Sequence, residues 1–142
     1  MVSDRVRRLE DHRGGQWHGR EDWEAVVPFF YGRWDAAAQA HAAVGAGQKN
    51  QEAAAVFGSE GAFDTDATRA ALATFAAPTL LLAGEFDVNT PPSRAADFAQ
   101  LFPDAGLVVQ PAAAHTPWLD DADQFVATTA TFLAGDQLAG QA

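Results

Sequence analysis

Two short apolar runs separated by a helical stretch constrain the fold of this chain more than any other feature of its sequence. Residues 79–83 and 106–110 are each apolar and bounded by turn-forming residues, which is typical of strands buried in a parallel sheet. Between them, Thr90 followed by Pro91 indicates the start of a helix, and a last helical stretch follows the second run. We therefore predict an α/β fold over residues 77–142, in the order strand, helix, strand, helix.

The first half of the chain has helical periodicity throughout, and we predict no strand in it. A short helix is expected before the glycine pair at Gly14 and Gly15, and Pro28 is expected to break the aromatic-rich stretch over residues 23–34. The division of the chain is therefore into a helical segment, residues 1–76, and the α/β part described above.

Side-chain caps predict where several helices begin, because Asp, Asn, Ser and Thr accept hydrogen bonds from the free backbone N–H groups of the first turn. Asp35 is expected to cap one helix and Thr65 another, and either Asp120 or Asp121 is expected to cap the last one. The helices expected between residues 35 and 76 run from Asp35 to the glycines at 45 and 47, over residues 50–57 and over residues 65–75.

One polar residue follows each predicted strand: Asp87 follows the first and His115 the second. A strand-helix-strand crossover makes the strands parallel, so both end at the same edge of the sheet, and neighbouring strands lie about 4.8 Å apart. The two side chains can then meet. A carboxylate that orients an imidazole, while the other ring nitrogen takes a proton, is the acid and base of a nucleophilic triad. The alternative is that Asp87 simply caps the following helix.

Composition narrows the classes of partner. The 142 residues include 19 acidic and 9 basic side chains, for a net charge of −10, which disfavours nucleic acid and anionic membranes as partners. The absence of cysteine excludes disulfides, thiolate metal sites and a cysteine nucleophile. His12 and His18 do not have the spacing of a zinc motif, so we expect no metal and no cofactor. With no secretory signal and no long apolar span, we expect a cytoplasmic protein.

The sequence around Asp87 and His115 resembles the C-terminal end of the α/β-hydrolase superfamily, and most closely its proline-iminopeptidase-like subgroup. The resemblance covers about residues 76–134 and is carried by APTLLLAGEFD at 77–87, FPDA at 102–105 and AHTPWLDD at 114–121. It implies that Asp87 is the triad acid and His115 the base. The family usually has a glycine before this histidine, where the present chain has Ala114.

Residues 21–76 resemble the helical lid or cap that this subgroup places over its pocket. Trp34 within this segment, with Phe86 and Trp118 beside the acid and base, are candidates for contacting a substrate. The alternative for each aromatic side chain is ordinary packing between the lid and the sheet, or within the core.

The serine nucleophile of the family, which lies on a G-x-S-x-G turn before the lid, has no match in this sequence. The serines are Ser3, Ser59 and Ser93, and Ser59 lacks the first glycine of the motif and follows a predicted helix, which favours a turn residue. We therefore predict a C-terminal portion of a hydrolase, inactive in isolation. A missing N-terminal half would supply the serine for attack on an ester, amide or peptide bond in a small molecule or short peptide. The alternative is a non-catalytic remnant or interaction module.

Overall fold

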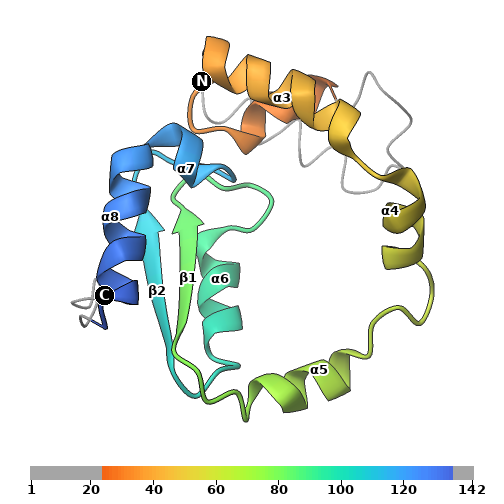
Figure 1. Ribbon diagram of the computed structural model, residues 1–142, viewed down its shortest axis with the longest axis vertical. Coiled ribbons are helices and arrows are strands. Elements are labelled where there is room, and N and C mark those ends of the chain that lie inside the picture. Colours follow the sequence, from red (N-terminus) through yellow and green to blue (C-terminus); the bar gives the residue numbers. More distant parts are fainter. Residues whose placement is uncertain (1–23, 136–142) are drawn as a thin grey trace.

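The computed structural model describes residues 24–135, so the short helix expected before Gly14 lies outside the described residues. Figure 1 shows an arc of helices, residues 27–72, on one side and a small α/β unit on the other. We call residues 27–72 the helical arc. The elements in chain order are η1 (Val27–Phe30), α3 (Ala36–Gln48), α4 (Gln51–Phe57), α5 (Thr65–Leu72), β1 (Thr79–Gly84), α6 (Pro92–Ala99), β2 (Ala105–Gln110), α7 (Pro117–Asp120) and α8 (Ala122–Leu133). This order confirms the predicted α/β fold class.

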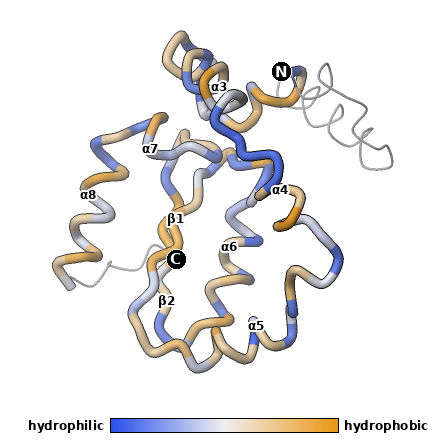
Figure 2. The backbone as a smooth tube through the Cα atoms, turned by 45° about the vertical axis from the view of Figure 1, so that its right-hand side comes forward, coloured by the Kyte–Doolittle hydropathy of each residue, from blue (hydrophilic) through white to orange (hydrophobic). Residues whose placement is uncertain are grey.

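Strands β1 and β2 pair in parallel, in a register that runs from Thr79 opposite Ala105 to Gly84 opposite Gln110. Helix α6 packs against both strands and α8 packs against β2, and the sheet lies between the two helices in Figures 1 and 2. Within the described range, the second edge of β1 has no strand beside it. The two strands therefore end together at one edge of the sheet, as the crossover requires.

Helices α3 and α4 begin where the sequence predicts. Asp35 caps α3, and its carboxylate accepts hydrogen bonds from the backbone N–H groups of Ala37 and Ala38, both at 3.0 Å. Helix α3 continues through the two expected terminal glycines as far as Gln48. Asn50 then caps α4 by accepting a hydrogen bond from the N–H of Ala53.

The predicted cap of α5 is wrong by one residue. Asp64 has the extended backbone of a cap and accepts a hydrogen bond of 2.9 Å from the N–H of Ala67. Thr65 is already the first helical residue, so its side chain lies too far along the helix to serve the same N–H. The helix also ends earlier than expected, at Leu72, and the boundary expected near residue 77 lies between α5 and β1. The division into two domains stays a prediction.

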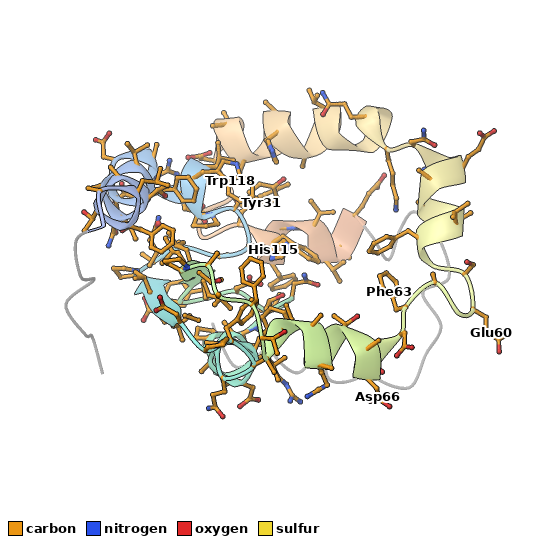
Figure 3. All side chains as sticks on the ribbon, turned by 60° about the horizontal axis from the view of Figure 1, so that its bottom comes forward. Tyr31, Glu60, Phe63, Asp66, His115 and Trp118 are labelled. Atoms are coloured by element: carbon orange, nitrogen blue, oxygen red, sulfur yellow. The ribbon has the colours of Figure 1, made fainter. Side chains whose placement is uncertain are left out.

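The side chains that the described residues bury are mostly small. The buried apolar residues are Val26, Ala38, Ala83, Ala95, Ala113 and Ala114. Larger apolar side chains on the helical arc remain exposed, among them Phe57 and Phe63, whose rings contact each other edge to face at 4.8 Å. Figure 3 shows Phe63 on the inner side of the arc, whereas Glu60 and Asp66 point outward. The Phe57–Phe63 pair is thus an exposed apolar cluster on the described helices.

Among the described helices, none combines the length and the apolar character that crossing a bilayer requires.

Candidate active site

The loops after the two strands bring Asp87 and His115 together. The Nδ1 atom of His115 lies 2.9 Å from Oδ2 of Asp87, although the two residues are 28 positions apart in the chain. The Asp87 side chain is 7% exposed and that of His115 is 41% exposed, so a buried carboxylate holds an imidazole that solvent can reach. The meeting predicted from the strand order is confirmed as geometry.

The second oxygen of Asp87 fixes the direction of its carboxylate. Oδ1 accepts hydrogen bonds from the backbone N–H groups of Asn89 at 2.8 Å and Thr90 at 2.9 Å. Helix α6 begins at Pro92, with Pro91 in the cap position and no side-chain cap. Asp87 therefore stabilises the turn before the helix, and the alternative prediction that it caps α6 is wrong.

The contacts of His115 select one tautomer. A carboxylate accepts the proton on Nδ1, so the lone pair of the imidazole lies on Nε2. The Nδ2 amide group of Asn89 lies 3.3 Å from Nε2, so the same residue whose N–H holds Asp87 also contacts the imidazole. The sequence analysis did not predict a role for Asn89, although its position two residues after Asp87 was a signal that could have indicated one.

The two adjacent aspartates after the histidine have different roles. Asp121 caps α8 by accepting a hydrogen bond from the N–H of Gln124 at 3.0 Å. Asp120 is buried in α7, a short helix that the sequence analysis missed, and accepts hydrogen bonds from the backbone of Ala114 and Gly32. Asp120 therefore belongs to the support of the histidine loop and not to the cap of the last helix.

A hollow of about 450 Å³ opens beside the acid and base. It is lined by Leu81, Leu82, Ala83, Gly84, Asp87, Thr90, Ala95, Phe98, Ala114, His115, Pro117, Trp118 and Phe125. Trp118, one of the predicted substrate contacts, is in this lining together with His115. Phe86 is exposed and Trp34 packs against Tyr31 with ring centroids 5.2 Å apart; neither lines the hollow.

The two described serines, Ser59 and Ser93, are exposed. Ser59 is exposed in the turn after α4, where its hydroxyl donates to the carbonyl of Val56 at 2.7 Å. Ser93 is exposed in the first turn of α6. In the described residues, neither serine forms a hydrogen bond with His115, while Ser3 lies outside them.

Residues 24–135 contain no group of three or more His, Cys, Asp or Glu side chains that could hold a metal ion. His12 and His18, which the sequence analysis considered as ligands, lie outside this range. An imidazole oriented by a carboxylate, as His115 is by Asp87, can transfer protons.

Residues 41–139 match the family model described as TAP-like protein. Among solved structures, the chain is similar to a thermophilic esterase from Thermogutta terrifontis, studied with malate bound, at 28% sequence identity and a TM-score of 0.46. That match covers 48% of this chain and 25% of the esterase chain, so the chain spans about a quarter of that protein. No curated protein gives a significant match.

Proposed function

Because the chain belongs to the TAP-like family of the α/β-hydrolase superfamily, we propose that it supplies the acid and base of a serine-type hydrolase. One observation carries the proposal: a buried Asp87 carboxylate holds Nδ1 of His115 at 2.9 Å while the imidazole lines an open hollow. An acid and a base in this arrangement are two of the three groups of a nucleophilic triad.

The proposed reaction uses a serine hydroxyl from a further polypeptide segment. His115 Nε2 takes the hydroxyl proton as the serine oxygen bonds to the carbonyl carbon of the substrate, and then returns the proton to the leaving group as the acyl-enzyme forms. Water, deprotonated by the same nitrogen, then cleaves the acyl-enzyme and regenerates the serine. Asp87 stabilises the imidazolium that exists between these transfers. The apolar lining of the hollow favours an ester, amide or peptide substrate with an apolar group.

The free edge of β1 supports the proposal that this segment is an N-terminal half. Leu81 and Leu82 of β1 both line the hollow, which therefore lies beside this strand. A strand added to the free edge of β1 would pair its unpaired backbone groups and lie beside the loop that carries Asp87.

We place the chain in the proline-iminopeptidase-like subgroup, on the sequence around Asp87 and His115 and on the run of helices before β1. In this assignment α3, α4 and α5 form the lid, and the substrate is a small molecule or a short peptide.

An interaction module without activity is the second candidate. The observation in its favour is the number of large apolar side chains that the described residues leave exposed, since such surfaces are typical of binding sites for other chains. The two proposals predict different results when a partner restores the sheet. An interaction module would bind the partner without cleaving any substrate, whereas the hydrolase would also cleave a substrate.

The test is complementation. The full chain is mixed with, or fused to, the N-terminal half of a TAP-like hydrolase that carries G-x-S-x-G, and hydrolysis of an activated ester is measured near pH 8. We expect activity to appear, His115→Ala to remove it by several orders of magnitude, and Asp87→Asn to lower the rate by up to about 10⁴-fold. Asp121→Asn is the matched control and should change the rate by less than about tenfold, because asparagine also caps a helix.

The chain alone gives the complementary measurement. A fluorophosphonate probe, which reacts with activated serines, should leave it unlabelled. Stoichiometric labelling of Ser59 or Ser93 would contradict the proposal and identify a complete enzyme of another design. Binding of the N-terminal half without any hydrolysis would favour the interaction module.

A further inference from the structure

We propose that Asp120 is a positioning residue for His115, fastening the histidine loop to the segment that follows η1. The inference rests on the proposed function in one respect, namely that His115 is the base. Asp120 touches neither the imidazole nor Asp87 by any hydrogen bond in the described structure, so it acts through the backbone on which His115 is carried.

The carboxylate of Asp120 joins two distant pieces of backbone. Its Oδ2 accepts a hydrogen bond of 2.8 Å from the N–H of Ala114, the residue directly before His115. The same carboxylate accepts from the N–H of Gly32, at 3.0 Å to Oδ1 and 3.1 Å to Oδ2. Gly32 is 88 positions away in sequence, so one side chain connects the helical arc to the loop of the base.

A second set of contacts runs parallel to the first. The N–H of His115 itself donates to the carbonyl of Phe30 at 3.0 Å, and the two rings contact edge to face at a centroid distance of 5.7 Å. One residue beyond Gly32, the guanidinium of Arg33 donates to the carbonyl of Leu119 at 3.1 Å. The backbone N–H groups of Ala114 and His115 are thus both held from outside their own loop.

The backbone at Gly32 lies too close to the histidine loop and to Asp120 for residue 32 to carry a side chain. A Cβ atom added to Gly32 would lie 2.2 Å from the carbonyl oxygen of Ala112 and 3.0 Å from the carboxylate of Asp120. Glycine therefore permits the contact that Asp120 makes with this N–H. The same loop holds Ala112 at φ 56°, a left-handed conformation that a residue other than glycine keeps only when its surroundings enforce it.

The chemistry of Asp120 suits this role. The residue is 8% exposed, and the partners that the described structure gives it are backbone N–H groups without any Lys or Arg. Hydrogen bonds from N–H to a carboxylate are stronger than those between neutral groups, and removal of a buried acceptor leaves each donor without a partner.

The experiment measures the tautomer of His115 in the full chain, by ¹⁵N NMR of imidazole nitrogens after selective histidine labelling. His115→Gln assigns the signal among the four histidines. In the parent chain we expect the proton on Nδ1, and in Asp87→Asn we expect the Nε2–H form that free imidazole favours. Asp120→Leu, which keeps the branched shape and removes both acceptors, should lower the ratio of Nδ1–H to Nε2–H by about tenfold, the low end for losing a charged hydrogen bond. Asp120→Asn, which keeps one oxygen, should give a smaller change.

Asp121→Asn is the matched control, because it alters the neighbouring carboxylate without touching the histidine loop, and it should leave the ratio unchanged. An unchanged ratio in Asp120→Leu, in a chain whose helical circular dichroism equals that of the parent, would overturn the proposal. Should both Asp120 variants fail to fold, hydrogen exchange of the parent decides. The amides of Gly32 and Ala114 should exchange at least roughly tenfold more slowly than that of exposed Gly61, and equal rates would overturn the proposal.

This readout needs neither a substrate nor a serine. If complementation gives no hydrolysis while the Asp120 variants still change the tautomer of His115, the proposed hydrolase function fails and the positioning role stands. If hydrolysis appears and the tautomer does not respond to Asp120, the positioning role fails alone.

Discussion

Substitution of Gly84 by alanine tests how closely β1 supports the histidine loop. The glycine ends the strand, and a Cβ atom there would lie 2.1 Å from the carbonyl oxygen of Ala114 and 2.7 Å from the carbonyl carbon and oxygen of Ala113. Optimal separations of non-bonded heavy atoms are about 3.5–4.0 Å, so the backbone directly before His115 must move by more than about 1 Å. These atoms belong to the main chain and cannot rotate away as a flexible side chain would.

The expected cost follows from that displacement. Extra atoms forced into a packed site destabilise proteins by about 1–3 kcal/mol, and a clash with backbone belongs at the upper end of this range. The total free energy of unfolding of a domain is about 5–15 kcal/mol, so Gly84→Ala removes a measurable share of it. Because the displaced segment carries the base, the same variant should also shift the tautomer of His115 towards Nε2–H.

Gly45→Ala provides the matched control, because it is the same chemical change in helix α3 with nothing within 4 Å of the new atom. Alanine is a better helix former than glycine, so this variant should be more stable than the parent by about 0.5–1 kcal/mol. Urea denaturation followed by circular dichroism gives both values. A free energy of unfolding for Gly84→Ala within about 0.5 kcal/mol of the parent would refute the reasoning, since only a loop free to move could absorb the added atom at so small a cost.

Two further predictions concern pH and helix capping. Tyr31 is the one tyrosine of the chain, and burial and the charge of Asp120 raise its pKa. The midpoint of its absorbance titration should therefore lie at higher pH than that of free tyrosine, and should move back towards it in Asp120→Asn. The free energy of unfolding should fall as the pH rises above about 10, because the tyrosine of the unfolded chain ionises first. Asp64→Ala should lower the free energy of unfolding by about 1 kcal/mol through loss of the α5 cap, while Thr65→Ala should not reproduce this loss of capping, and equal effects in denaturation would contradict the assignment.

The pairing of Asp87 with His115 was predictable from topology together with the resemblance of the sequence around both residues. Two apolar runs joined by a helix produce parallel neighbouring strands, so residues that follow them lie at one edge of the sheet, where their side chains can meet. The α/β fold class was predictable for the same reason. The cap of α5 was less so, because Asp64 and Thr65 are both good capping residues and the periodic pattern does not fix where a helix begins to within one residue.

The contacts of Asp120 were not predictable from local pattern. Next to Asp121, it is one of two equivalent candidates for the cap of α8, and its partner Gly32 lies far away in sequence. The missed helix α7 did leave a signal. Thr116 followed by Pro117 repeats the pattern that correctly indicated α6, but no helix was predicted from it.

Asp87 and His115 are held by different parts of the chain. Asp87 is fixed by the N–H groups of residues two and three positions after it, within its own turn. His115 is fixed from the segment between Phe30 and Gly32, at the start of the helical arc. A displacement of that arc therefore moves the base and leaves the acid in place. If the arc is the lid of the proposed hydrolase, binding under the lid would act on the hydrogen bond between Asp87 and His115, and hence on the basicity available for the serine.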